Sequence, residues 1–310
     1  MLKRTPLPDG VIQFTSARGV LGRPVYFTAA YWVAGLLIDT GCAHTAQELL
    51  RATNDLRLDL IVNTHSHEDH IGANGPLQAR RSVPIQAHSL ALPVLANPRL
   101  QPLQPYRRYF WGWPQPSQAT ALGEQVAAGP YVLQVIPTPG HSPDHVCFFE
   151  PHVGWLFSGD AFVGGRDRAL RLGYDIYGII NSLKTLSRLP IKRLFSGSGS
   201  VRDNPLPDIQ AKIEYLEEMG ERVRQLHAQG LSEEQIGRTL AGSRTLWIRM
   251  GGVREPATSS ARRCALPTSP WGTSPGGIWC ARTWPLPRES GNQGIGESGP
   301  DFLITDSLIP

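Results

Sequence analysis

The feature that most constrains this chain is the run His-Ser-His-Glu-Asp-His at residues 65–70. It follows directly after residues 58–62, a short apolar segment that predicts a buried strand. Zinc binds imidazole nitrogen and carboxylate oxygen readily, and a turn at a strand end can aim alternate side chains at two neighbouring metals. The run therefore predicts a metal site at the end of this strand, in preference to a polar loop whose histidines fall there by chance.

Two further candidate ligands, His141 and Asp160, also follow predicted strands. His141 ends the sequence Pro-Thr-Pro-Gly-His after residues 132–136, and Asp160 ends Ser-Gly-Asp after residues 154–157. Glycine lets the backbone turn sharply and bring the next side chain inward. A lone His or Asp at a strand end is more often a capping residue, but the order and spacing of these two favour metal binding.

The rest of the pattern up to about residue 205 alternates strands with helices. The expected strands are residues 26–39, 58–62, 83–87, 132–136, 146–149, 154–157 and 191–195. Thr45 and Glu48 resemble a capping box that opens a helix, and helical spacing predicts a second helix over residues 176–189. Residues 97–118 have no clear period and are expected to be a long connection.

The motif set resembles the metallo-β-lactamase-fold hydrolase superfamily over about residues 10–205. That superfamily includes glyoxalase II-type thioesterases, lactonases, β-lactamases and nucleases. The resemblance implies an α/β fold, a four-layer αββα sandwich with the metals at one edge of the paired sheets. It also implies that Asp39, in an Asp-Thr-Gly turn, supports the ligands from behind.

The resemblance assigns a role to each candidate ligand. It implies that His65, His67 and His141 bind one metal, that Asp69 and His70 bind the second, and that Asp160 bridges the two.

The chain departs from the family at Ser198, where the family usually supplies one more histidine to the second metal. A hydroxyl is a far poorer zinc ligand than imidazole. We therefore expect one tight zinc site and a weaker second site, completed by water or empty at low zinc. An alternative is that His145 or Glu68 replaces the missing ligand, although a plain polar loop residue is the simpler interpretation of His145.

The function predicted from these residues is that of a zinc-dependent hydrolase, in which a metal-bound hydroxide attacks an ester, thioester or lactone-type substrate. Asp69 and Asp160 are the candidate catalytic residues, since either carboxylate can hold the nucleophile and pass a proton to the leaving group. Tyr174 or Tyr177 is a candidate hydrogen-bond donor to the oxyanion, against the simpler role of helix packing.

Two alternatives remain open. One is a mononuclear iron oxidoreductase similar to persulfide dioxygenases. A weakened second metal site is consistent with it, because such an enzyme uses a single iron ion. The other is a catalytically impaired family member.

The expected partner is a small-molecule substrate. Nucleic acid is not favoured, because the net charge is only +4 and no basic run stands out.

Residues 105–113, Pro-Tyr-Arg-Arg-Tyr-Phe-Trp-Gly-Trp, combine aromatic and guanidinium groups that suit an acyl or anionic substrate. They are interpreted either as a cover over the metal cleft, with Arg107 and Arg108 binding substrate, or as a packed surface loop.

The four cysteines include no Cys-x-x-Cys pair, which argues against a zinc ribbon or a redox motif. The N-terminal residues lack the apolar run of a secretory signal, and no segment has the length of a membrane span. We therefore expect a cytoplasmic protein, while the sequence leaves its oligomeric state open.

Three segments are expected along the chain. Residues 1–205 form the catalytic domain, and residues 206–245 form a small C-terminal helical extension, in which Ser232 with Gln235 marks a helix start. Residues 246–310 form an irregular tail rich in Pro, Gly, Ser, Arg and Trp. Disordered segments are usually poor in aromatics, so the tail is interpreted either as disordered or as an out-of-frame reading of the gene.

Overall fold

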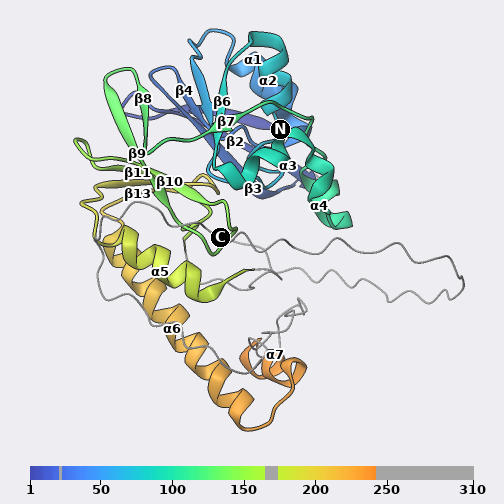
Figure 1. The fold of residues 1–310 in the computed structure, drawn as a ribbon, viewed down its shortest axis with the longest axis vertical. Helices are drawn as coiled ribbons and strands as arrows, with labels where there is room; N and C mark the ends of the chain where they lie inside the picture. Colours follow the sequence, from blue (N-terminus) through green and yellow to red (C-terminus); the bar gives the residue numbers. More distant parts are fainter. Residues whose placement is uncertain (21–22, 165–173, 242–310) are drawn as a thin grey trace, which may run out of the picture. The chain divides into compact units, whose positions relative to one another are not determined.

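The computed structural model describes residues 1–20, 23–164 and 174–241, which form two β-sheets with helices on their outer faces (Figure 1). The tail predicted at 246–310 lies outside the described residues. Sheet A contains β1 (Leu2–Pro6), β2 (Ile12–Val20), β3 (Arg23–Val33), β4 (Leu36–Ile38), β5 (Leu60–Val62), β6 (Ile85–Ala87) and β7 (Thr120–Ala121). Sheet B contains β8 (Gln125–Ala128), β9 (Tyr131–Pro137), β10 (Val146–Glu150), β11 (Trp155–Gly159), β12 (Arg193–Ser196) and β13 (Val201–Asp203).

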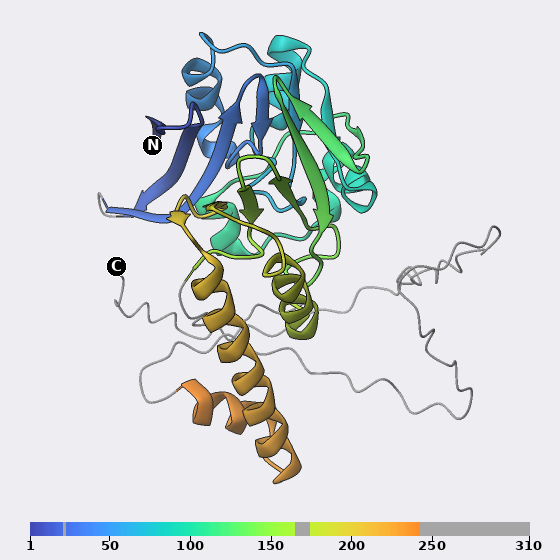
Figure 2. The same cartoon turned by 90° about the vertical axis from the view of Figure 1, so that its left-hand side faces the viewer.

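The described helices are distributed between the strands. They are α1 (Ala46–Ala52), α2 (Asn74–Arg81), α3 (Leu92–Ala96), α4 (Pro105–Phe110), α5 (Ile176–Leu186), α6 (Leu206–Ala228), α7 (Glu233–Ala241), and the short 3-10 helices η1 (Ala43–Thr45), η2 (Ser89–Ala91) and η3 (Pro98–Leu100). The 23-residue α6 runs beside α5 (Figure 2). Within the described part of the chain, we find no helix with both the length and the apolar character needed to cross a bilayer.

Sheet A follows the sequence order from β1 to β7. Its pairs from β1 to β4 are antiparallel and those from β4 to β7 are parallel. The carboxyl ends of β4, β5 and β6 therefore meet at one edge of the sheet. In sheet B, with order β13-β12-β11-β10-β9-β8, the pair β11–β12 is parallel and the other pairs are antiparallel.

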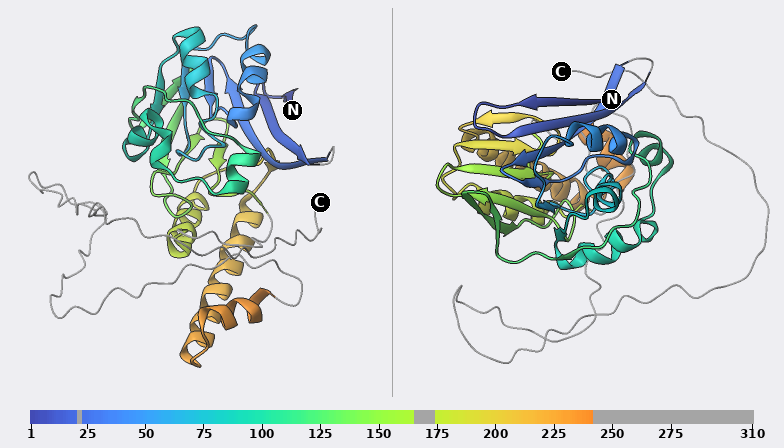
Figure 3. Two further views of the ribbon diagram at one scale, coloured as in Figure 1. Left: turned by 90° about the vertical axis from the view of Figure 1, so that its right-hand side faces the viewer. Right: turned by 90° about the horizontal axis from the view of Figure 1, so that it is seen from above.

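Three hydrophobic layers join these elements. Between the sheets, Val62 of sheet A packs in one cluster with Phe148 and Phe157 of sheet B; Figure 3 shows the strands of the two sheets from above. A second cluster packs α1, α2 and α3 on sheet A, and a third packs α5 and α6 on sheet B. Burial of these apolar faces is the main force that holds the layers together. The predicted four-layer αββα sandwich is confirmed.

Several local expectations are confirmed. The segments 146–149 and 154–157 form the hairpin β10–β11. Ser232 and Gln235 make a reciprocal capping box at the start of α7, where Gln235 N donates to Ser232 Oγ over 3.3 Å and Ser232 N donates to Gln235 Oε1 over 2.8 Å.

Two local expectations are wrong. Residues 26–39 are not one strand, because Ala34 and Gly35 have positive φ angles and turn the chain between β3 and β4. The capping box at Thr45 does not form, because its hydroxyl donates to Cys42 O and Glu48 pairs with the N-terminal amine instead. Residues 97–118 belong to the long connection between β6 and β7, as expected, and this connection contains η3 and α4.

Candidate functional site

The segment 65–70 follows β5 at the edge of sheet A where the parallel strands end. Its main chain is fixed from both sheets. On one side, Thr40 N, after β4, donates to His70 O over 2.8 Å. On the other side, Ser66 N donates to Asp144 Oδ2, between β9 and β10, also over 2.8 Å. Two hydrogen bonds, one from each side, thus hold the main chain of the segment.

Three of the predicted ligands, His65, His67 and His141, converge on a common point. Nδ1 of His67 lies 2.9 Å from Nε2 of His65 and 2.9 Å from Nε2 of His141. All three side chains offer a nitrogen within 4.8 Å of the other two. Such a set of imidazole nitrogens has the donor chemistry and the spacing that a zinc ion requires.

A second group of donors is formed by His65, His70 and Asp160, again with ligand atoms within 4.8 Å of one another. Asp160 lies between the groups, with Oδ1 3.4 Å from His70 Nε2 and Oδ2 3.4 Å from His141 Nε2. Asp69 belongs to neither of the groups found among the described residues, although its Oδ2 lies 3.9 Å from His70 Nε2. The structure thus brings the predicted residues together, with Asp69 at the margin.

Asp39 supports the site from behind, as the resemblance implied. Its Oδ2 accepts hydrogen bonds from the Thr64 hydroxyl over 2.8 Å and from His70 Nδ1 over 2.7 Å, and its Oδ1 accepts one from Thr64 N over 2.8 Å. The carboxylate is buried, and a bond of this kind to Nδ1 fixes the tautomer that leaves Nε2 free to bind a metal.

His145 is neither a ligand of the two groups nor a plain loop residue. It is buried, its Nε2 accepts a hydrogen bond from Asp160 N over 3.1 Å, and its Nδ1 lies 2.8 Å from the hydroxyl of Thr138. Since both ring nitrogens are engaged, His145 positions the main chain of Asp160. The expectation that it replaces the missing ligand has no support in this geometry.

The charges of the site are set by burial and by close neighbours. Burial lowers the pKa of His65 and His67, because desolvation disfavours the charged imidazolium, and adjacent imidazoles lower it further. Both rings are therefore neutral near pH 7, which is the state that donates a lone pair to a metal.

The pKa of His70 moves the other way. Burial by itself lowers it, but the carboxylates of Asp160 and Asp39 outweigh burial and raise it. For Asp160, burial by itself raises the pKa, but the imidazoles of His70 and His141 hold it well below its usual range. The Asp160 carboxylate is therefore ionised, and it adds a negative charge to a site whose other close donors are imidazoles.

The loop that carries Ser198 lies against this second group. A Cβ built at Gly197 would come within 2.4 Å of Asp160 Oδ1 and 2.9 Å of His70 Cε1, so only glycine allows this approach. The hydroxyl of Ser198 lies 3.0 Å from that of Ser196 and donates to Val163 O over 3.4 Å. Serine thus stands beside the site but has hydrogen-bond partners of its own.

The two tyrosines considered as donors lie in different places. The ring centroid of Tyr174 lies 4.7 Å from that of His141, which puts it beside the first group. Tyr177, on α5, accepts a hydrogen bond from Arg224 of α6 over 2.8 Å. The helix-packing interpretation therefore suits Tyr177, whereas Tyr174 stays a candidate at the site.

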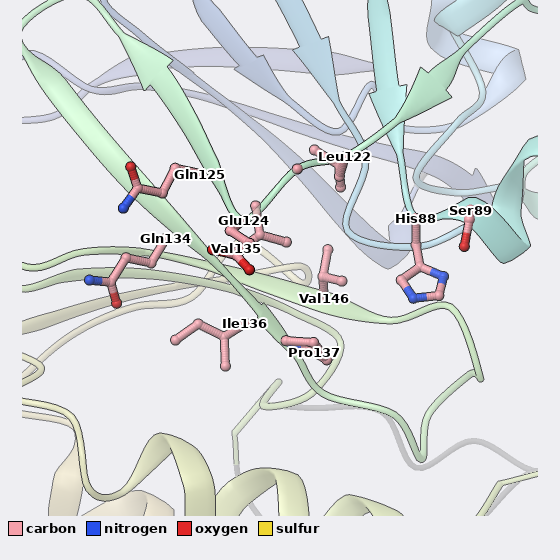
Figure 4. Close-up of a pocket in the computed structure, with 11 residues that line it drawn as sticks. His88, Ser89, Leu122, Glu124, Gln125, Gln134, Val135, Ile136, Pro137 and Val146 are labelled. Atoms are coloured by element: carbon pink, nitrogen blue, oxygen red, sulfur yellow. The ribbon is translucent and has the colours of Figure 1, made fainter. Parts of the chain in front are cut away.

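A cavity of 640 Å³ opens near the same edge of the sheets (Figure 4). Its lining includes His88, which follows β6, Gln134 and Pro137 of β9, and Val146 of β10. Val146 N donates to Thr64 O over 2.8 Å, which connects the cavity wall to the segment that precedes the histidines. The cavity contains none of the predicted ligands.

Three contacts at the site have no signal in the sequence. Asp144 fixes Ser66, Thr28 of β3 donates to Asp69 O over 2.8 Å, and Arg107 of α4 binds Glu68. Each joins residues at least 39 positions apart, so no local pattern marks them. Arg107 is therefore committed to a carboxylate of the protein, and the expectation that it contacts substrate directly is not supported.

Comparisons with known proteins agree with this geometry. The chain is 31% identical over 162 residues to a hydroxyacylglutathione hydrolase of Bdellovibrio bacteriovorus, a match that covers 51% of this chain and 55% of the relative. It is 27% identical to a hydroxyacylglutathione hydrolase of Idiomarina loihiensis, over 63% of this chain and 68% of the relative. The matches thus span only about half to two thirds of these relatives.

Solved structures support the fold. A metallo-β-lactamase from Pontibacter korlensis superposes with a TM-score of 0.53 and 23% identity, covering 70% of this chain and 99% of that one. The sequence model of the metallo-β-lactamase superfamily matches residues 23–198, which include every predicted ligand. The chain belongs to the metallo-β-lactamase superfamily.

Proposed function

We propose that this chain is a zinc-dependent hydrolase that cleaves an ester, thioester or lactone-type bond in a small-molecule substrate. The observation that carries the proposal is the pair of donor groups that share His65, with the ionised carboxylate of Asp160 between them. Two relatives named hydroxyacylglutathione hydrolase support a thioester as the first substrate class to test.

The residues present suit two metal positions. In this proposal His65, His67 and His141 hold one zinc ion, Asp69 and His70 hold the second, and Asp160 contributes to both. Three buried imidazoles, the half-buried imidazole of His67 and two carboxylates form a set typical of zinc centres in hydrolases. When bound, zinc supplies an acidified water and an electrophile for the carbonyl oxygen.

The protein's own groups then orient and move protons. A water oxygen bonds to the carbonyl carbon, the bond to the leaving oxygen or sulfur breaks, and one proton passes from the water to the leaving group. Asp160 is the first candidate to accept this proton, because its carboxylate lies 3.4 Å from both His70 Nε2 and His141 Nε2 and its main chain is fixed by His145. Asp69, at the margin of the site, is the second candidate.

The second metal position is expected to be the weaker one. Ser198 stands where the family usually supplies histidine, and neither proposed replacement is free. Both ring nitrogens of His145 are engaged, and both oxygens of Glu68 bind Arg107. Metal titration of the purified chain should therefore give two unequal affinities.

This asymmetry also keeps a second candidate function open, a mononuclear iron oxidoreductase of the persulfide dioxygenase type. Metal identity in protein purified without added metal discriminates between the two, since iron at one equivalent favours the oxidoreductase and zinc favours the hydrolase.

The test of the proposed function combines metal analysis with a screen of thioesters, esters, lactones and phosphodiesters. Zinc-dependent hydrolysis that is lost in His67→Ala, with the fold retained by circular dichroism, is the expected result. A fully zinc-loaded chain that hydrolyses none of these classes would contradict the proposal and favour an impaired family member.

A further inference from the structure

Glu68 and Arg107 form a bidentate ion pair at the border of the metal-binding segment. Arg107 Nε donates to Glu68 Oε1 over 2.6 Å and Nη2 donates to Oε2 over 2.5 Å. The Glu68 side chain is 1% exposed and that of Arg107 is 13% exposed. Since Glu68 stands between His67 and Asp69, this buried pair ties α4 directly to two proposed ligands.

A second set of contacts joins the same elements by another route. Tyr26 of β3 packs edge-on against Phe110 of α4 and against Trp111, with ring centroids 4.7 and 5.7 Å apart. Two residues further along β3, Thr28 donates to Asp69 O. The metal-binding segment, β3 and α4 thus form a closed ring of contacts.

The far end of α4 is fixed as well. Arg18 Nη1 of β2 donates to Tyr109 O over 2.5 Å, and its guanidinium lies 4.3 Å from the centroid of the Tyr109 ring. The Nε2 of His44 lies 3.0 Å from the same carbonyl oxygen. Basic groups at the carboxyl end of a helix stabilise it. A six-residue helix, too short to be stable alone, is thereby held at its middle by Glu68 and at its carboxyl end by Arg18, His44 and Tyr26.

Several side chains of β3 and α4 that are exposed to solvent are aromatic. We call Tyr26, Tyr106 and Tyr109 the aromatic patch; their exposed fractions are 52, 38 and 48%. Tyr26 and Tyr106 both pack on Trp111, and Tyr26 and Tyr109 both pack on Phe110. Tyr109 also lines a cavity of 460 Å³. Tyr106 precedes Arg107, which binds Glu68, and Tyr26 stands two residues before Thr28, which binds Asp69 O. Exposed aromatic side chains in a group are typical of a surface that binds an apolar ligand.

We propose that the aromatic patch binds an apolar acyl or aryl group of the substrate, and that Arg107 is the positioning residue that holds α4 in place for this contact. The inference rests on the proposed function and narrows its substrate class. It predicts that the chain prefers substrates, esters or thioesters, whose acyl part is hydrophobic over those whose acyl part is small or polar.

The test compares 4-nitrophenyl acetate with 4-nitrophenyl octanoate on the zinc-loaded full chain. The wild type should have a KM about tenfold lower for octanoate, because several methylenes become buried on aromatic rings. Arg107→Ala and Tyr106→Ala should each raise the octanoate KM about tenfold relative to the acetate KM, and Arg107→Lys should recover part of the loss. Arg80→Ala, an exposed arginine on α2, is the matched control and should change neither value.

A second measurement does not depend on turnover. Binding of sodium octanoate and of sodium acetate to the zinc-loaded chain is followed by NMR, and octanoate should bind about tenfold more tightly, with the difference lost in Tyr106→Ala. Binding without hydrolysis of any ester would refute the proposed function while supporting the patch. Equal KM values together with equal binding would overturn the patch, as would an Arg107→Ala variant that lowers kcat alone. Tyr106→Ala, at an exposed position, keeps the test valid if Arg107→Ala does not fold.

Discussion

Replacing Asp39 by asparagine tests the support behind the proposed second metal position. Asp39 has a φ of 59°, a conformation that asparagine tolerates, and the two side chains have nearly the same volume. The substitution therefore changes hydrogen bonding with little change in packing. In the native site both oxygens accept, Oδ1 from Thr64 N and Oδ2 from His70 Nδ1.

An amide has only one oxygen, so one of these partners must change. If the amide nitrogen faced Thr64 N, two donors that cannot rotate away would oppose each other in a buried site. The nitrogen therefore takes the Oδ2 position, where His70 Nδ1 can accept instead. In the neutral ring, that exchange places the proton of His70 on Nε2, the atom that lies 3.4 Å from Asp160 and faces the proposed metal.

Metal binding then requires the other tautomer, in which Nδ1–H faces the amide N–H. A buried donor left without an acceptor costs about 1–3 kcal/mol. Since about 1.4 kcal/mol corresponds to a tenfold change, affinity at this position should fall by about one to two orders of magnitude, similar to the effect of other groups behind metal ligands.

The assay is competition for zinc with a chromophoric chelator, and the control is Asp55→Asn, which alters an exposed carboxylate paired with Arg4. The first zinc equivalent should bind with unchanged affinity in both variants, and only Asp39→Asn should lose the second. If Asp39→Asn binds two equivalents as tightly as the wild type, the tautomer argument is wrong.

Three further changes follow from the same geometry. Ser198→His should strengthen binding of the second zinc equivalent at least tenfold in the same competition assay, and an unchanged second affinity would show that position 198 does not face the metal. Gly197→Ala should weaken zinc binding, because its Cβ would lie 2.4 Å from Asp160 Oδ1 and must displace the carboxylate; isothermal titration measures this, and native affinity would contradict the contact. Leu183→Ala, which removes a fully buried side chain between α5 and its neighbours, should lower the free energy of unfolding by about 2–5 kcal/mol in urea denaturation, while a loss below about 1 kcal/mol would contradict the packing.

The family resemblance implied the four-layer sandwich, and the residue pattern was sufficient to predict the strand ends that carry the candidate ligands, for a definite physical reason. Residues 58–62, 132–136 and 154–157 are apolar segments that overlap β5, β9 and β11, and each is followed by a polar side chain on a turn. In a layered α/β fold the ends of such strands meet at one edge, so side chains far apart in sequence come together there. His141 and Asp160 lie beside residues 65–70 for this reason.

Local patterns fail where a side chain has a competing partner. The Thr45 hydroxyl bonds back to Cys42 O, because η1 already occupies the turn in which a capping bond would form. The short helix α4 has no buried side chain of its own along Pro105–Phe110, so no apolar period marks it. Its helical form depends on tertiary contacts, which a sequence window does not contain.

The pair of Glu68 and Arg107 shows why the specificity of the site is harder to predict than its chemistry. The ligands of a metal must be few and of restricted type, so a short run of histidines is informative by itself. The surface next to the ligands includes α4. This helix is held by the contact between Glu68, inside that run, and Arg107, 39 residues later. Neither residue is unusual alone, and the same sequence with Arg107 turned to solvent would keep every predicted ligand. Substrate choice in this chain is therefore expected to depend on residues that the metal-binding motif does not include.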